Sequence, residues 1–141
     1  NLGLARRNGS ALTLAYIDLD DFKRINDNHG HNEGDRLLRV IGQTLRQGTR
    51  GTDRVARLGG DEFALLLPDT NTDGAREAIG KVRQLLRESL NSAGFSVTCS
   101  VGAMTFSRPP PSVDEAIRAA DHLMYQVKSQ GKDAVAFDTR S

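Results

Sequence analysis

Cysteine, tryptophan and long apolar runs are scarce or missing in this sequence of 141 residues. The single cysteine, Cys99, cannot form an internal disulfide or build a cysteine-rich zinc site, which predicts a reducing compartment. No stretch is long enough to cross a membrane, since even the apolar residues 64–67 end at Pro68, and no signal peptide is present. The sequence therefore predicts a cytoplasmic domain, either free or as the cytosolic part of a membrane-anchored parent protein.

An excess of one charge is also missing. Lys and Arg total 19 against 18 for Asp and Glu, and a net charge of +1 indicates no positive stripe for a nucleic-acid backbone. We therefore expect no nucleic-acid partner. With 38% hydrophobic and 26% charged residues, the composition is that of a folded globular protein, and the length fits a single domain over residues 1–141.

Apolar patterns and turn residues predict strands and helices in a mixed order. The expected order is strand, two helices, two strands, helix, strand, helix, strand. Such an α/β chain is most simply folded as one sheet with helices packed on its faces. The expected strands cover residues 10–17, 54–58, 63–67, 96–106 and 134–137, and the last helix starts at the capping box formed by Ser112 and Glu115.

An acidic cluster, Asp18, Asp20 and Asp21, follows the first apolar strand. Taken alone, it is more often a solvated turn, because Asp is common in turns. However, a carboxylate at the end of a buried strand is costly unless it is paired or bound to a cation. Carboxylates together with backbone carbonyls and phosphate oxygens are ligands that Mg²⁺ prefers, so a magnesium site is the alternative reading.

Gly59 and Gly60 separate two of the predicted strands and precede Asp61 and Glu62. A glycine pair between strands is often only a hairpin turn. It also lets the backbone approach a bulky ligand closely. If this hairpin lies beside the first strand, Asp61 and Asp18 can share a metal, as in the two-carboxylate sites of nucleotidyl transfer.

Between these motifs lie polar residues with two possible roles. Lys23, Asn26 and Asp35 fit a solvated helix face and a helix cap. Together, an amide and a carboxylate also offer partners for the hydrogen-bonding edge of guanine. The histidines His29 and His31 lack further ligands at zinc spacing, which favours structural roles for both.

Taken jointly, these motifs resemble the GGDEF family of diguanylate cyclases. The resemblance is carried, in order and spacing over nearly the whole chain, by DLDDFKRIND at 18–27, GHNEGD at 30–35, RLGGDEF at 57–63, SVG at 100–102, and ADHLMYQVK at 120–128 followed by Gly131 and Lys132. It implies a palm-like nucleotidyl-cyclase fold with a mostly antiparallel five-stranded sheet flanked by helices. It also implies condensation of two GTP into cyclic di-GMP by a homodimer of GTP-loaded domains.

The resemblance also implies roles for individual residues. Mg²⁺, or alternatively Mn²⁺, would be bound by Asp18, Asp61, Glu62 and the Leu19 carbonyl, and Asp61, Glu62 and Lys23 would form the catalytic set. Guanine and the phosphates would be held by Asn26, Asp35, the backbone at Phe22 and Lys23, the Gly59–Gly60 turn, Lys128 and Lys132. Sensor or other signalling domains would occupy the rest of the parent protein.

An inhibitory product site is the last implied feature. Arg50 and Asp53 stand three apart shortly before the glycine pair, and Arg83, or less favourably Lys81, would add a second arm. The chain differs from the family pattern in two places: the usual N-terminal segment is missing before residues 1–9, and Lys132-Asp133 replaces the usual Arg-Asn. Lys keeps the charge at 132 but loses the bidentate fork of Arg, which predicts a weaker grip on phosphate.

Two other functions stay open. A non-catalytic GGDEF domain could bind GTP or cyclic di-GMP as a regulatory module. A cyclase making another cyclic nucleotide would need a different base at Asn26 and Asp35.

Overall fold

The protein, described by a computed structural model over residues 11–140, alternates strands and helices in the expected order. Residues 1–10 and 141, and the side chains of Asn26, Asn28, His29 and His31, lie outside this description. The elements are β1 (Leu12–Leu19), α2 (Phe22–His29), α3 (His31–Gln47), β2 (Arg54–Gly59), β3 (Glu62–Pro68), α4 (Thr72–Ser92), β4 (Cys99–Phe106), α5 (Val113–Ser129) and β5 (Val135–Arg140).

The strands form one five-stranded sheet in the order β2-β3-β1-β4-β5. Neighbours are antiparallel except β4 and β5, which run parallel, so the predicted mostly antiparallel sheet is confirmed. Strand β1 lies in the middle, and seven of its eight residues are buried. A strand covered on both faces reads as a continuous apolar run, which explains the apolar residues before Asp18.

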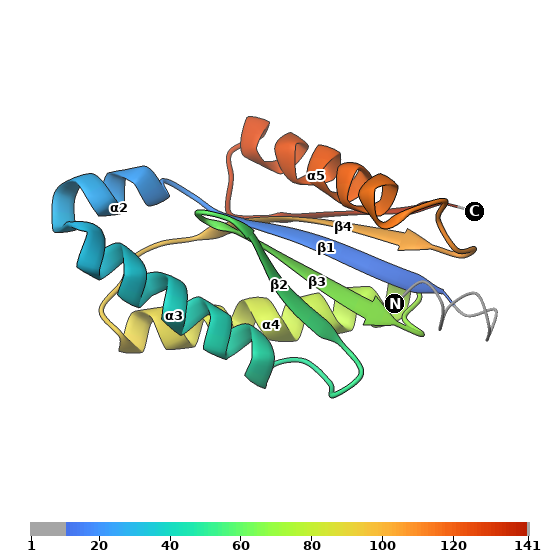
Figure 1. Ribbon diagram of the computed structural model, residues 1–141, viewed down its shortest axis with the longest axis horizontal. Coiled ribbons are helices and arrows are strands. Elements are labelled where there is room, and N and C mark those ends of the chain that lie inside the picture. Colours follow the sequence, from blue (N-terminus) through green and yellow to red (C-terminus); the bar gives the residue numbers. More distant parts are fainter. Residues whose placement is uncertain (1–10, 141) are drawn as a thin grey trace.

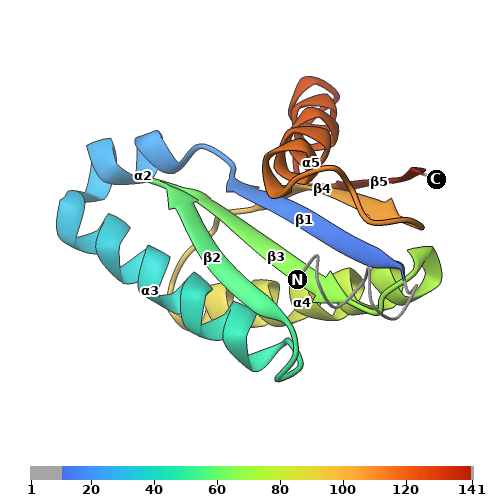
Figure 2. The ribbon, with the colours of Figure 1, turned by 45° about the vertical axis from the view of Figure 1, so that its right-hand side comes forward.

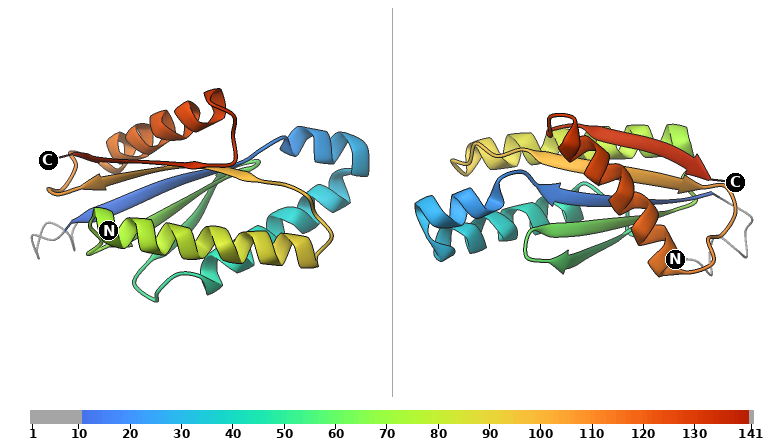
Figure 3. Two further views of the ribbon diagram at one scale, coloured as in Figure 1. Left: turned by 180° about the vertical axis from the view of Figure 1, so that it is seen from behind. Right: turned by 90° about the horizontal axis from the view of Figure 1, so that it is seen from above.

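Helices cover both faces of the sheet (Figures 1 and 2). On one face, α3 and α4 pack over the larger apolar core, and α4 contributes a stripe of buried residues at helical spacing: Ala75, Ile79, Val82, Leu86 and Leu90. On the other face, α5 crosses β1 and β4 above a smaller core (Figure 3). None of the helices described is long and apolar enough to span a membrane.

Helix α5 lies very close to β4 because Gly102 has no side chain. A Cβ atom at position 102 would overlap the Ala120 carbonyl oxygen and the Met124 nitrogen. Both are backbone atoms, so the helix itself would have to move. This close packing fixes the position of α5 and therefore of Lys128, near the end of that helix.

Strand β4 starts three residues later than predicted, at Cys99 instead of residue 96. The parallel pairing with β5 begins only at Val101 and Val135, and residues 95–98 run past the end of that strand. Beyond the pairing, the Asp20 amide donates to the Thr98 carbonyl at 2.9 Å. The alternating apolar pattern in the sequence therefore begins before the hydrogen-bonded strand itself does.

Candidate active site

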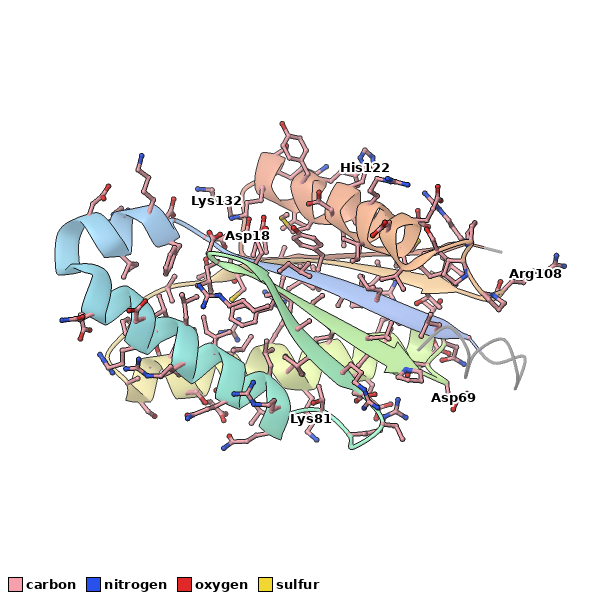
Figure 4. The ribbon with its side chains drawn as sticks, in the orientation of Figure 1. Asp18, Asp69, Lys81, Arg108, His122 and Lys132 are labelled. Carbon is pink, nitrogen blue, oxygen red and sulfur yellow. The ribbon has the colours of Figure 1, made fainter. Side chains whose placement is uncertain are left out.

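Three carboxylates meet where β1 ends beside the hairpin between β2 and β3. Asp18 lies directly opposite Glu62 in the antiparallel register. Carboxylate oxygens of Asp18, Asp61 and Glu62 all lie within 4.8 Å of one another. The hairpin therefore lies beside the first strand, and the structure brings together the three side chains expected to bind a metal. Figure 4 shows Asp18 at this end of the sheet.

Asp18 is the most electrostatically unfavourable member of this cluster. Its side chain is 15% exposed, and its Oδ1 atom is buried without a hydrogen-bond partner among the described residues. Burial, reinforced by the nearby charge of Asp61, raises the pKa of Asp18 to about 7. An unpartnered buried oxygen next to two further carboxylates fits a divalent cation, and a hard ion such as Mg²⁺ prefers such oxygen ligands.

Lys128 of α5 supplies positive charge at the cluster. Its Nζ atom donates to the Leu19 carbonyl at 3.0 Å and lies 3.1 Å from Asp20 Oδ1 and 3.4 Å from Asp18 Oδ2. Burial works to lower the pKa of Lys128, but the carboxylates raise it overall, so the ammonium stays charged. Lys128 thus contacts two groups expected to bind metal, Asp18 and the Leu19 carbonyl.

Asp20 is fully buried and connects β1 to its neighbours, a role that the sequence did not reveal. Ser100 and Thr98 each donate a hydroxyl hydrogen bond to its carboxylate at 2.6 Å, and the Asp133 amide donates at 3.1 Å. Burial alone would raise the pKa of Asp20, but these hydrogen bonds and Lys128 together hold it below its usual range. Strand alternation would put Asp18 and Asp20 on the same face, and Asp20 lies one residue beyond the end of β1, so strand periodicity gave no signal for this role.

Arg57 and Tyr16 were also not predicted as site residues. The Arg57 guanidinium donates to the carbonyls of Gly59 and Gly60 at 3.1 and 2.9 Å, which braces the turn. Tyr16 is buried on the same face as Asp18, diagonal to Glu62. Burial and a hydrogen bond to Glu62 raise the pKa of the Tyr16 phenol, so it remains a neutral donor that holds this carboxylate.

The residues expected to bind nucleotide come from several elements, α2, α3, α5 and the turn before β5. Asp35 of α3 lines a cavity of about 300 Å³ together with Arg57 and Phe63 from the hairpin strands. Lys23 is exposed on α2, while Phe22 is half-buried against the core. Lys132 pairs with Asp21 at 2.9 Å, close to Asp18 (Figure 4). Helix α2 itself lies beyond the end of the sheet (Figure 1).

Arg50 and Asp53, expected to bind product, pair with each other on the loop between α3 and β2. The Arg50 Nη2 atom lies 3.0 Å from Asp53 Oδ1 and donates to the Pro68 carbonyl at 2.8 Å, while the Asp53 side chain is 3% exposed. Lys81 of α4 lines the same cavity of about 530 Å³. Arg83 does not: it lies in another cavity and pairs with Asp133 at 3.3 Å. Of the two residues considered for the second arm, Lys81 therefore shares the cavity with Arg50 and Arg83 does not, and Lys81 lies far from Asp18 (Figure 4).

The chain is similar to known proteins over nearly its whole length. The family model described as "Diguanylate cyclase, GGDEF domain" matches residues 1–134. Diguanylate cyclase DgcP from Pseudomonas aeruginosa is 36% identical over 130 residues, which are 90% of this chain and 19% of DgcP. The chain therefore spans about a fifth of the length of that relative.

Solved structures show the same fold. Diguanylate cyclase SiaD from Pseudomonas aeruginosa, in complex with its activator SiaC, has a TM-score of 0.86 and 33% identity, covering 97% of this chain and 54% of that chain. The GGDEF domain of DgcB from Caulobacter crescentus, in complex with c-di-GMP, has a TM-score of 0.82 and 25% identity, covering 96% of this chain and 82% of that chain.

Proposed function

Since the chain belongs to the GGDEF family of diguanylate cyclases, we propose that it condenses two GTP molecules into cyclic di-GMP and releases two pyrophosphates. The observation that carries the proposal is the cluster of Asp18, Asp61 and Glu62 at the glycine turn, with an unpartnered buried oxygen on Asp18. An isolated solvated turn would not bury that oxygen, because burial without a partner is costly.

Different residues of this chain would bind the metal, accept the proton and approach the nucleotide. Asp18, Asp61, Glu62 and the Leu19 carbonyl would hold Mg²⁺ or Mn²⁺, which lowers the pKa of a 3′-hydroxyl and offsets charge on the α-phosphate. Asp61 accepts the proton of that hydroxyl, with Glu62 assisting. The turn at Gly59 and Gly60 lets the backbone approach the nucleotide.

Base and phosphate contacts come from the helices. Asp35 accepts hydrogen bonds from guanine at the rim of its cavity, and Asn26 supplies the complementary amide. The backbone at Phe22 and the positive charge of Lys23 face the phosphates. Lys128 and Lys132 now pair with carboxylates, so phosphate binding exchanges one set of oxygen partners for another.

Catalysis requires two copies of the domain under this proposal. Each copy binds one GTP, and each 3′-hydroxyl must attack the α-phosphate held by the other copy. Sensor or regulatory domains elsewhere in the parent protein would control the association of the two copies. The reaction would take place in the cytosol, because its substrate GTP is found there. A single domain held apart from its partner is expected to bind GTP without forming product.

Product inhibition completes the proposal. Arg50 presents a planar guanidinium that suits phosphate or guanine, and Lys81 adds a second positive charge in the same cavity. The side chain of Arg50 is 57% exposed, so it is accessible to a ligand. Arg50→Ala is expected to relieve inhibition by added cyclic di-GMP, and unchanged inhibition would exclude this site.

The decisive experiment measures product formed by the domain fused to a dimerising segment, with GTP and Mg²⁺. Cyclic di-GMP should form, and Asp61→Asn should abolish turnover while circular dichroism shows an intact fold, since the change removes a ligand and not a core group. GTP binding without product in the fused protein would favour a regulatory module. Formation of another cyclic nucleotide would show that the base assignment at Asp35 is wrong.

A further inference from the structure

Helix α4 and the segment leading into β4 enclose a cavity of about 330 Å³ that the proposed reaction does not use. Its inner wall is apolar, because the buried side chains of Leu86, Leu90 and Cys99 line it. Arg83 and Arg87 line it as well, one helical turn apart on α4. The cavity therefore combines an apolar wall with two guanidinium groups.

The charges in this cavity do not cancel. Arg83 pairs with Asp133, with 3.3 Å between Nη2 and Oδ1. Arg87 is exposed and forms no ion pair with any residue that the structure describes. One positive charge thus remains without a partner next to a buried apolar surface. A guanidinium binds a carboxylate through two parallel hydrogen bonds, so an anion of this kind is its natural complement.

The polar side of the cavity is hydrogen-bonded to Asp20, next to the carboxylate cluster. Thr98 and Asp133 both line the cavity, and both hydrogen-bond to Oδ2 of Asp20, through the Thr98 hydroxyl at 2.6 Å and the Asp133 amide at 3.1 Å. The other oxygen of Asp20 lies 3.1 Å from Lys128 Nζ. Asp133 has a φ of 48°, a left-handed conformation that is uncommon for a residue other than glycine. A ligand touching this wall therefore acts on the hydrogen bonds that hold Asp20.

We propose that this cavity binds a small amphipathic monocarboxylate and that its occupancy is linked to the active site through Asp20. The carboxylate lies on Arg87, and the apolar body lies against Leu86 and Leu90. The volume is at the low end of small-molecule sites, about 300–1,000 Å³, which suits a single ring or short chain. The site is separate from the cavity beside Arg50, where product inhibition is proposed.

The test is a titration of the isotope-labelled domain with octanoate, followed by the chemical shifts of backbone amides. Amides of residues 96–99 should shift with one-site saturation at about 1–5 mM, as expected for a ligand of this size. Amides of Asp20 and Asp133 should shift with the same midpoint, because linkage acts through their hydrogen bonds. Octanol, which lacks the charge, and acetate, which lacks the chain, serve as ligand controls.

Variants separate the two parts of the proposal. Arg87→Glu should weaken octanoate binding about tenfold or more, since it replaces an attractive charge with a repulsive one, while Arg118→Glu on α5 should leave binding unchanged. Thr98→Val should preserve binding and reduce the shift at Asp20. Equal binding of octanol, an unaffected Arg87→Glu variant or the absence of saturation would overturn the site, and an unmoved Asp20 amide in the unmodified protein would overturn the linkage.

Discussion

Replacing Asp18 by Asn is expected to make the metal-free protein more stable at neutral pH. The pKa of Asp18 is about 7, against an ordinary value of 3.8, because the folded state buries this carboxylate beside Asp61. The two values differ by about 3, and each pKa unit corresponds to about 1.4 kcal/mol, so ionising Asp18 costs the folded state about 4 kcal/mol at most. Asn has nearly the same shape and carries no charge.

The direction in which stability changes with pH follows from proton binding to Asp18. Between pH 3.8 and 7 the folded state keeps a proton on Asp18 that the unfolded chain has lost, so stability falls as pH rises through this range and is constant above it. About 1–2 kcal/mol of the loss has already occurred by pH 5, which leaves about 2–3 kcal/mol between pH 5 and 8. Asp20, whose pKa is lowered, acts in the opposite sense but only in more acidic solution.

Urea unfolding in EDTA at pH 5, 6, 7 and 8 measures this effect. The free energy of unfolding of Asp18→Asn, minus that of the unmodified protein, should grow by about 2–3 kcal/mol over this range. Asp138→Asn, a change at an exposed carboxylate, should give a constant difference. Mg²⁺ should stabilise the unmodified protein at pH 8 and leave Asp18→Asn unchanged. Parallel pH curves for Asp18→Asn and the unmodified protein would refute the electrostatic reasoning.

Three further predictions concern packing, positioning and reactivity. Gly102→Ala should lower the free energy of unfolding by at least about 3 kcal/mol in urea titrations, because the new Cβ meets backbone atoms of α5, whereas Gly80→Ala, with open space around it, should raise it by about 0.5–1 kcal/mol. Tyr16→Phe should reduce turnover of a dimerised enzyme about tenfold, the equivalent of one hydrogen bond to the charged Glu62, with little change in fold by circular dichroism. Cys99, which is 7% exposed and whose pKa is raised to about 12 by burial, should react with a thiol reagent much more slowly than an exposed cysteine does, because little of it is thiolate at neutral pH.

The sheet and the acidic cluster could be predicted from the sequence because they depend on short-range patterns. An apolar run followed by Asp18 indicated the end of a buried strand, and the glycine pair before Asp61 indicated a hairpin. Antiparallel pairing then brings both carboxylates to the same end of the sheet. To predict that Asp18 and Asp61 lie close together, it was enough to assume that β1 and β3 are neighbouring strands.

Contacts that depend on helix rotation and side-chain conformation could not be predicted. Lys81 and Arg83 are two positions apart on α4 and point about 160° away from each other, so the rotation of the helix decides which of them faces Arg50. Lys128 was expected near phosphate, yet its contact with Asp20 depends on how closely α5 approaches β4. The left-handed conformation of Asp133, which delivers an amide to Asp20, has no local sequence signal.

The central position of β1 has a consequence for the order in which the molecule opens. Its backbone is paired on both sides, and the strand is almost entirely buried, so its amide protons should exchange with solvent only when the whole domain unfolds. Helix α2, beyond the end of the sheet, lacks such cover and should exchange through local opening. Asp18 therefore belongs to the last part of the molecule to open, whereas α2, which carries the proposed base contact Asn26, can open locally while the carboxylates keep their places.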